Sequence, residues 1–181
     1  MPEPTPEAVY VIEVSSYQLD LTTTFAPDVA ILTNISPDHL DRHGGMDGYV
    51  AAKARIFQAQ GPDAVALIGV DESWGQGIAR DLAQRVITIS TRPSPPRGEG
   101  YVAQPGVILN GGEPIADLTA ARSLPGRHNA QNAAFAYATA RALGVSHDAA
   151  VAGLLSFPGL AHRMDCCLLY TSPSPRDLST S

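Results

Sequence analysis

Two short stretches of the sequence carry side chains that could bind a cation or a phosphate. Glu13 lies near the end of the apolar run Ala8–Val14, and Asp38 and His39 follow the next such run, Asp28–Asn34. Runs of this kind predict strands, and ligands of parallel sheets bind at the carboxyl ends of the strands. A carboxylate and an imidazole at one such edge could hold a hard cation, with phosphate oxygens completing its shell. The alternative is that Asp38 caps a turn and that Glu13 and His39 are ordinary solvated residues.

Lys53 is the only lysine in a chain that has eleven arginines. It follows Tyr49 by one turn in the predicted helix Tyr49–Gln60. A lone helical lysine is usually a surface residue whose aliphatic stem covers apolar neighbours. A chain that uses arginine for general surface charge can, however, keep a lysine for chemistry that arginine cannot perform, because only an amine can become neutral and react.

The segment Leu124–Ala136 opens an alanine-rich helix with Asn129 and Asn132 near its start. Amide side chains at a helix N-terminus could meet a nucleotide base or a phosphate, although N-capping by Asn129 explains the same pattern. Further along the chain, Arg163 could bind a phosphate through two hydrogen bonds or simply pair with Asp165.

The elements that must position these residues alternate between strands and helices. After the first two strands, we expect strands at Ala64–Val70 and Arg85–Ser90, helices at Gln76–Gln84, His128–Gly144 and Ser146–Phe157, and an antiparallel hairpin within Tyr101–Leu118. The hairpin turns at Asn110, Gly111 and Gly112, which is a common turn sequence. The alternation indicates βαβ units. The expected fold class is therefore α/β, a mostly parallel sheet flanked by helices, with a small antiparallel hairpin.

Composition excludes several classes of function. The net charge is −6 and no cluster of basic residues is present, which argues against nucleic-acid and anionic-membrane partners. No apolar run approaches the roughly 20 residues of a membrane span, and the N-terminus lacks the features of a signal peptide. The only cysteines, Cys166 and Cys167, are adjacent, so a disulfide framework is not expected. We expect a cytoplasmic protein.

Taken in order, five segments resemble the central domain of the Mur ligase family. They are VIEVSSYQLD (11–20), ILTNISPDHLDRH (31–43), YVAAKARIF (49–57), LPGRHNAQNAAFA (124–136) and FPGLAHRMD (157–165). The pair Tyr17-Gln18 favours the D-glutamate-adding members of the family. The members that add diaminopimelate or lysine typically have a histidine after the two serines.

The resemblance implies a role for each matching residue. Glu13 corresponds to an acidic ligand of the ATP-bound magnesium, and His39 to the histidine that helps to bind a second magnesium near the substrate. Lys53 corresponds to a lysine that is carbamylated, so that its carbamate acts on the second metal. Ser15 and Gln18 would lie beside the muramoyl substrate.

The nucleotide contacts are implied in the same way. Asn129 and Asn132 correspond to a pair that meets the nucleotide, with Asn132 at the adenine. His162 and Arg163 correspond to the pair at the hinge into a C-terminal domain, where the arginine approaches the nucleotide phosphates.

The activity implied is ATP-dependent formation of an amide bond in peptidoglycan synthesis, with Mg²⁺ as a further cofactor. The substrates would be UDP-N-acetylmuramoyl-L-alanine and D-glutamate, joined through an acyl phosphate by an enzyme that is monomeric when intact. Two alternatives stay open. One is another ligase of the family, either a diaminopimelate-adding enzyme or a folylpolyglutamate synthase. The other is a non-catalytic nucleotide-binding domain.

The sequence departs from the family in one respect. It contains no GxxxxGK[ST] phosphate loop, since its only lysine is Lys53. We therefore expect a fragment that is inactive alone. Its expected parts are a partial central domain at 1–161, the start of the hinge at 162–165, and an anomalous tail at 166–181. The tail is rich in Ser, Thr and Pro, which predicts disorder, and it is expected to be non-native.

Overall fold

A computed structural model describes residues 5, 8–93 and 98–159 of the chain. They form a six-stranded sheet with the strand order β1-β2-β3-β4-β5-β6. The strands are β1 (Val29–Leu32), β2 (Val65–Gly69), β3 (Arg85–Ser90), β4 (Gly100–Gln104), β5 (Val107–Asn110) and β6 (Glu113–Asp117). The helices are α1 (Ser16–Leu19), α2 (Leu40–His43), α3 (Met46–Ala54), the 3₁₀ turn η1 (Arg55–Phe57), α4 (Ser73–Asp81), α5 (Gly126–Ala142) and α6 (His147–Ser156).

The sheet is parallel from β1 to β4 and antiparallel from β4 to β6. The predicted hairpin is confirmed, because β5 ends at Asn110 and β6 begins at Glu113. Gly111 and Gly112 form its turn with φ of 58° and 92°, a pair of positive values that a two-residue hairpin turn requires. Because β4 pairs in parallel with β3, the antiparallel strands extend the main sheet, and the predicted α/β class is confirmed.

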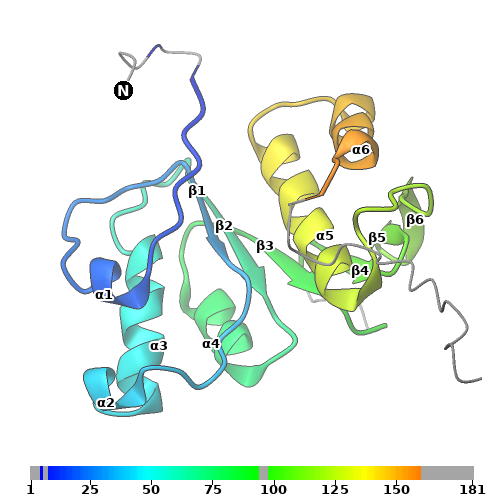
Figure 1. The fold of residues 1–181 in the computed structure, drawn as a ribbon. Coiled ribbons are helices and arrows are strands. Elements are labelled where there is room, and N and C mark those ends of the chain that lie inside the picture. Colours follow the sequence, from blue (N-terminus) through cyan, green and yellow to red (C-terminus); the bar gives the residue numbers. More distant parts are fainter. Residues whose placement is uncertain (1–4, 6–7, 94–97, 160–181) are drawn as a thin grey trace, which may run out of the picture.

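Helices cover both faces of the sheet (Figure 1). Val65 and Leu67 of β2 face the core formed with α5 and α6, whereas Ala66 and Ile68 face the core formed with α3 and η1. This alternation follows from the two-residue period of a strand, and it explains why all of β2 is buried. The layers position the carboxyl ends of β1, β2 and β3 beside the N-terminus of α5.

The helix predictions are confirmed with shifted boundaries. The helix expected at Tyr49–Gln60 begins earlier, at Met46, and its last turn is the 3₁₀ turn η1. Ser146 caps α6 as its position predicts, with its hydroxyl accepting a hydrogen bond from the Ala149 N–H. Among the described helices, none combines the length and the apolarity needed to cross a bilayer.

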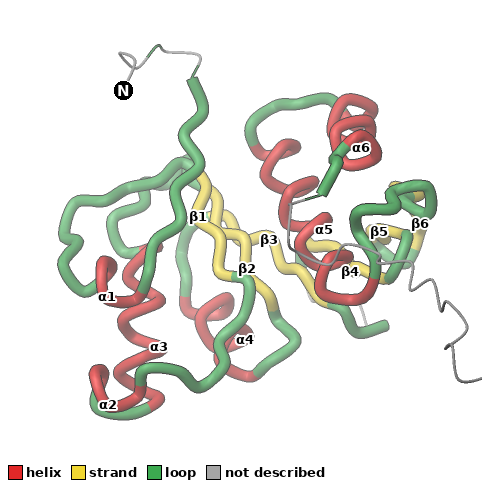
Figure 2. Tube along the Cα trace, in the orientation of Figure 1, coloured by secondary structure: helices red, strands yellow, loops and turns green. Residues whose placement is uncertain are grey.

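The strand prediction for Ala8–Val14 is wrong. This segment is an irregular chain that leads into α1 (Figure 2), and the side chains of Val11 and Ile12 are 93% and 62% exposed. β1 is one of the two edge strands among the described residues, and the segment does not pair with it. Apolar, β-branched composition favours a strand only where a neighbouring strand and a buried face are available. Glu13 consequently lies in a loop and not at a strand end.

The predictions for 160–181 lie outside the described residues. They include His162 and Arg163, the hinge at 162–165, the adjacent cysteines Cys166 and Cys167, and the tail at 166–181.

Candidate functional site

The single turn α1 is fixed by the two residues predicted to lie beside a substrate. The Ser15 hydroxyl accepts a hydrogen bond from the Gln18 backbone N–H at 3.3 Å, and the Gln18 side chain accepts one from the Ser15 backbone N–H at 2.9 Å. This reciprocal arrangement is a capping box. Ser15 and Gln18 therefore lie side by side at the entrance of α1, directly after Glu13.

His39 is held in an uncommon conformation between β1 and α2. Its φ is 50°, and it is the only described residue other than glycine with positive φ. Such conformations are rare outside glycine and are found preferentially at functional sites. Its backbone N–H donates to an Asp38 carboxylate oxygen at 2.9 Å, and its ring meets the Tyr17 ring edge-on, with the centroids 5.0 Å apart. The loop thus presents His39 against α1.

A row of rings connects His39 to Lys53. Tyr17 on α1 touches both His39 and His43, and the His43 ring in turn touches Tyr49 on α3. The Lys53 ammonium lies 5.7 Å from the centroid of the Tyr49 ring, one turn away on α3, which is within the range of a cation–π contact. Burial raises the pKa of the Tyr49 phenol, and the negative charge of Asp38 raises it further. Tyr49 is therefore a neutral partner for the lysine.

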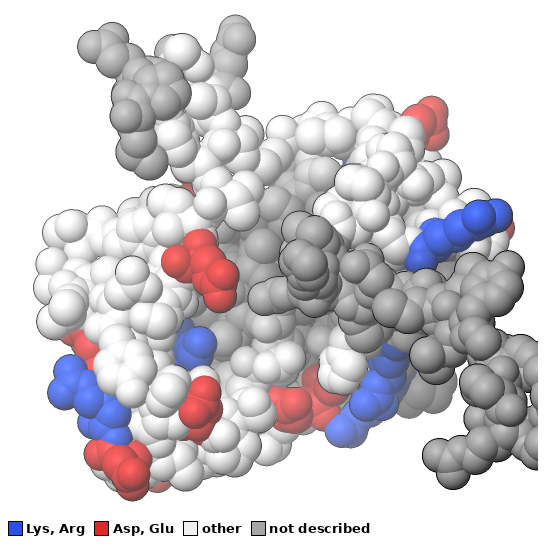
Figure 3. Space-filling view, viewed as in Figure 1, with Lys and Arg blue, Asp and Glu red and all other residues white. Residues whose placement is uncertain are grey.

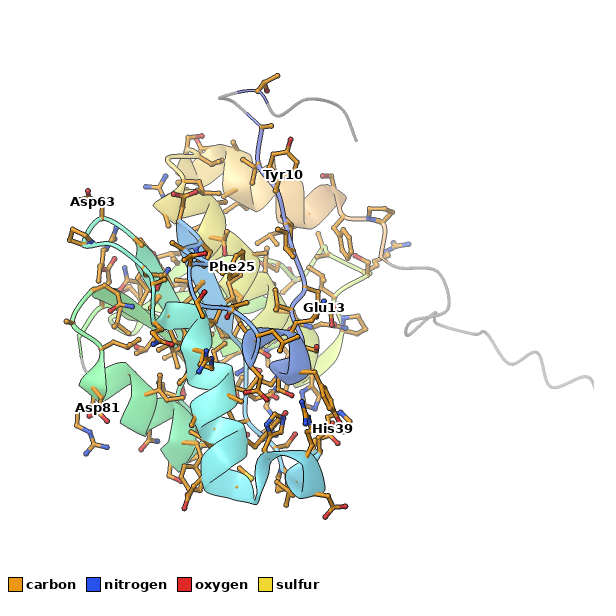
Figure 4. The ribbon with its side chains drawn as sticks, turned by 90° about the vertical axis from the view of Figure 1, so that its left-hand side faces the viewer. Tyr10, Glu13, Phe25, His39, Asp63 and Asp81 are labelled. Carbon is orange, nitrogen blue, oxygen red and sulfur yellow. The ribbon has the colours of Figure 1, made fainter. Side chains whose placement is uncertain are left out.

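Glu13 is exposed and lies on the chain leading into α1. Figure 4 shows Glu13 and His39 on the same side of the molecule, at the right of that view. The structure therefore places His39, Ser15 and Gln18 at α1, Lys53 beside Tyr49 on the neighbouring helix α3, and Glu13 on the segment before α1. Within the described part of the chain, no three His, Cys, Asp or Glu side chains gather as a metal cluster.

The carboxyl ends of the strands form a second part of the site. Asp71, two residues after β2, accepts hydrogen bonds from the Ser90 hydroxyl at 2.7 Å, from the Thr91 backbone N–H at 2.9 Å, and from the Thr91 hydroxyl. Burial alone raises the pKa of Asp71, but the hydrogen bonds from Thr91 and Ser90 and the nearby charge of Arg92 outweigh it, so that the pKa falls below its ordinary value. Asp71 is thus an anion that ties the loop after β2 to the end of β3.

A cavity of about 170 Å³ opens between these strand ends and the start of α5. Its lining is mostly polar, and it consists of Thr33, Asn34, Gly69, Asp71, Glu72, Thr91, Arg92, Arg127, His128 and Gln131. A Cβ on Gly69 would lie 1.9 Å from the Thr33 carbonyl oxygen, so only glycine permits this close approach of β1 and β2. Polar groups from three strand ends and from one helix N-terminus therefore converge on one cavity.

The predicted nucleotide residues Asn129 and Asn132 lie on the first turns of α5. Pro125 is the N-cap of this helix, so the alternative of N-capping by Asn129 is wrong. The Asn129 side chain instead donates to the Pro125 carbonyl oxygen at 3.0 Å. Asn132 is exposed one turn further along. Neither asparagine lines the cavity, which takes His128 and Gln131 from the same helix.

The described residues of the face in Figure 3 carry scattered acidic and basic side chains without a continuous basic patch. This distribution agrees with the net charge of −6 and gives no support for a polyanion-binding surface on that face.

Several residues of the site were missed by sequence reasoning. Asp71 and Glu72 follow β2 as Asp38 follows β1, so the rule on strand ends that selected Asp38 applies to them as well. Gln131 and His43 have no such signal. An amide inside a helix is unremarkable by sequence, and His43 acquires its partners through packing against α1, which is distant along the chain, and against Tyr49 on α3.

Comparison with known proteins agrees with this architecture. The family model described as the Mur ligase middle domain matches residues 3–140. A curated relative from Caulobacter vibrioides, named UDP-N-acetylmuramoylalanine--D-glutamate ligase, is 56% identical over 164 residues, which are 87% of this chain and 35% of the relative. A relative of the same name from Paramagnetospirillum magneticum is 45% identical over 166 residues, 91% of this chain and 36% of the relative. The chain thus spans about a third of the length of these relatives.

Solved structures show the same fold. MurF from Acinetobacter baumannii superposes with a TM-score of 0.59 and 25% identity, over 83% of this chain and 33% of its own. The UDP-N-acetylmuramate:L-alanyl-gamma-D-glutamyl-meso-diaminopimelate ligase of Neisseria meningitides superposes with a TM-score of 0.61 and 20% identity, over 74% of this chain and 41% of its own. From the family match and the identity to curated relatives together, this chain belongs to the Mur ligase family, as part of its middle domain.

Proposed function

We propose that the chain is the central part of an ATP-dependent ligase that joins D-glutamate to UDP-N-acetylmuramoyl-L-alanine, the enzyme called MurD. The observation that carries this proposal is the 56% identity over 164 residues to a relative named for that reaction. The pair Tyr17-Gln18 supports it, because this pair resembles the D-glutamate-adding members of the family, and both residues lie on α1.

The proposed reaction has two steps. A carboxylate oxygen of the muramoyl-alanine attacks the γ-phosphorus of ATP, which releases ADP and leaves an acyl phosphate. The amine of D-glutamate then attacks the acyl carbon, and the tetrahedral intermediate expels inorganic phosphate while the nitrogen loses its proton. Both steps bring anionic oxygens close together, so positioning and charge neutralisation are the main contributions expected from the protein.

The cluster around α1 is assigned to the acyl substrate. Ser15 and Gln18 offer a hydroxyl and an amide at the entrance of the helix, and both are exposed. Lys53 lies on the neighbouring helix beside Tyr49. A carbamate on its nitrogen would turn a cation into an anion, and that requires the amine to lose its proton first.

Magnesium suits the side chains that line this region. Mg²⁺ prefers oxygen ligands and is usually held through one or two carboxylates together with substrate phosphates. Glu13 and Asp38 present exposed carboxylates, and His39 lies against Asp38 with its Nε2 at 3.3 Å from the carboxylate. We assign Glu13 to the ATP-bound ion and His39, with carbamylated Lys53, to a second ion. When bound, the metal neutralises phosphate charge.

The nucleotide is assigned to the start of α5. Asn129 and Asn132 lie on the first turns of this helix, and the helix N-terminus favours a negatively charged group. His162 and Arg163 stay in the proposal as hinge residues near the phosphates. Cytoplasmic location and a monomeric intact enzyme are likewise proposed.

The test uses the full-length gene product. Incubated with ATP, Mg²⁺, UDP-N-acetylmuramoyl-L-alanine and D-glutamate, it should release ADP and phosphate and form the D-glutamyl product, detected by mass spectrometry. Replacing D-glutamate with meso-diaminopimelate or L-lysine serves as the matched control. ADP release that depends on one of those amino acids would favour a different ligase of the family. No nucleotide turnover, together with no in-frame GxxxxGK[ST] upstream of Glu13, would favour a non-catalytic domain.

A further inference from the structure

His43 has an environment unlike that of the other candidate residues. Its side chain is only 3% exposed although it lies in a short surface helix. Its Nε2 lies 3.1 Å from the Ser16 hydroxyl oxygen, and its Nδ1 lies 3.4 Å from an Asp20 carboxylate oxygen. Ser16 is itself buried, at 2% exposure. Both ring nitrogens of His43 therefore face α1 and the residue that ends it.

The His43 ring also lies between two tyrosines. The centroid of Tyr17 is 5.7 Å away and that of Tyr49 is 5.6 Å away. Tyr17 contacts His39, and Tyr49 contacts Lys53. The buried imidazole of His43 thus contacts Tyr17, the neighbour of His39, and Tyr49, the neighbour of Lys53. It contacts neither His39 nor Lys53 itself.

The backbone around His43 is shaped for this packing. Gly44 and Gly45 have φ of 70° and 113° and turn the chain sharply between α2 and α3. A Cβ on Gly48 would lie 1.8 Å from the His43 carbonyl oxygen, so α3 can approach α2 this closely only with glycine at that position. Gly44, Gly45 and Gly48 thus allow α2, which ends at His43, to pack closely against α3.

The end of α1 is also held by Arg55, through contacts that do not involve His43. The Arg55 guanidinium donates to the carbonyl oxygens of Leu19 and Thr22, at 2.9 Å and 2.7 Å. The C-terminal end of α1 is therefore attached to the α3 region independently of His43. Without His43, α1 would stay attached at Arg55 but could change its orientation.

We propose that His43 is a positioning residue of the ligase, which sets the orientation of α1 relative to α3 through Ser16 and Asp20. The inference rests on the proposed function. Because the Asp20 carboxylate can only accept, the proposal requires Nδ1 to carry the proton and Nε2 to accept from the Ser16 hydroxyl. His43 then keeps Ser15, the N-cap of α1, and Gln18 on α1 at a fixed separation from Lys53 on α3.

Replacing His43 should affect the turnover of the enzyme more than its stability. Displacement of a substrate-positioning group by about 1 Å can lower a rate by about 100-fold. In the full-length ligase, we expect His43→Phe to lower kcat by about 10- to 100-fold while KM for ATP changes by less than about twofold. Phenylalanine keeps the ring between the two tyrosines and removes only the hydrogen-bonding nitrogens. His43→Gln restores a group that can bond to Ser16, so it should recover part of the lost kcat.

His147→Phe is the matched control. His147 also hydrogen-bonds a buried residue, with its Nδ1 at 2.9 Å from the Tyr137 hydroxyl oxygen, and it contacts that ring. His147 lies on α6, away from α1, so the kcat of the His147→Phe enzyme should stay at the wild-type value. Ser16→Ala combined with His43→Phe should lose no more than His43→Phe alone, since both remove the same contact. ¹⁵N-histidine NMR of the wild-type enzyme should show His43 protonated on Nδ1.

These measurements distinguish a failure of the proposed ligase function from a failure of the proposed role of His43. A wild-type enzyme without D-glutamate-dependent turnover contradicts the proposed function, and the NMR spectrum still decides the state of His43. If the wild type is active and His43→Phe keeps its kcat within twofold, His43 does not position α1. The same conclusion follows if His43→Gln is worse than His43→Phe, because ring bulk is then what matters. A proton on Nε2 would contradict the proposed contacts.

Discussion

Asp71 holds the carboxyl edge of the sheet together, and its removal should have a large effect on stability. Its carboxylate receives three donors from Ser90 and Thr91, which come from the end of the neighbouring strand. Asp71→Ala removes all of these bonds at once. The Thr91 N–H then loses its acceptor, and the Ser90 hydroxyl, in a residue only 4% exposed, loses its strongest partner.

The size of the effect follows from these contacts. A hydrogen bond to a charged group contributes about 1.5–3 kcal/mol, and the partly exposed carboxylate is screened by solvent, which reduces each contribution. Allowing about 1 kcal/mol for each of the three donors, we expect Asp71→Ala to lower the free energy of unfolding by about 3 kcal/mol. With a urea m-value of about 2 kcal/mol per molar, the unfolding midpoint should fall by about 1.5 M. Asp71→Asn keeps one acceptor oxygen and should cost about 1 kcal/mol.

Urea unfolding at several pH values tests this account. Trp74, the only tryptophan, lies in the first turn of α4, lines the same surface pocket as Asp71, and provides a fluorescence signal. The pKa of folded Asp71 is lowered, so its stabilisation is complete above the unfolded pKa of about 3.9 and is lost as the pH falls through the folded pKa. The difference between wild type and Asp71→Asn should therefore be constant from pH 7 to about 5 and shrink below about pH 4. Asp81→Asn, at a side chain that is 82% exposed, should change stability by less than about 0.5 kcal/mol. Equal effects at Asp71 and Asp81, or a difference that grows on acidification, would refute the reasoning.

Three further predictions concern activity and packing. In the full-length enzyme, Lys53→Arg should reduce turnover as strongly as Lys53→Ala, because arginine keeps the charge but cannot form a carbamate. Near-normal turnover of the arginine variant would return Lys53 to the role of a surface residue. The chain of 181 residues alone should release no ADP from ATP above a protein-free control, since it lacks a phosphate loop, and measurable release would contradict that. Gly48→Ala should lower the free energy of unfolding by about 2 kcal/mol through overpacking, whereas Gly153→Ala, whose new Cβ meets nothing within 4 Å, should raise it by about 0.5 kcal/mol. Similar urea midpoints for the two alanine variants would contradict the close approach at Gly48.

The elements that the sequence predicted well are those whose signals are local. β2 is a continuous apolar run between turn residues, and it is buried throughout. α6 begins after a serine that caps it, and the hairpin turns at two glycines with positive φ. In each case a few consecutive residues carry both the propensity and the boundary. The parallel pairing of β4 with β3 has no such signal, because it depends on contacts between separate segments.

In the candidate site too, the sequence predicted what is local and missed what depends on contacts between separate segments. Asp38 and His39 were found because they follow a predicted strand, and Lys53 because it is the only lysine of the chain. Their geometry was not predictable, since the row of rings between His39 and Lys53 is built by Tyr17 and His43, which belong to different helices. Residue type identifies which side chains could perform chemistry, but packing decides which of them meet.

The segment Ala8–Val14 shows why a correct propensity can give a wrong element. Its residues favour a strand, yet a strand is stabilised by pairing with a neighbouring strand and by burial of one face. Val11 has no paired strand, and it is 93% exposed. Glu13 depends on that outcome, because a residue at a strand end has a fixed direction and a residue in a loop does not. His39 shows the opposite case, since its left-handed backbone and its contact with Tyr17 fix it without any strand of its own. Within the described chain, the candidate residues held by packing, His39 and Lys53, are therefore defined in position, whereas Glu13 requires a further contact to fix its direction.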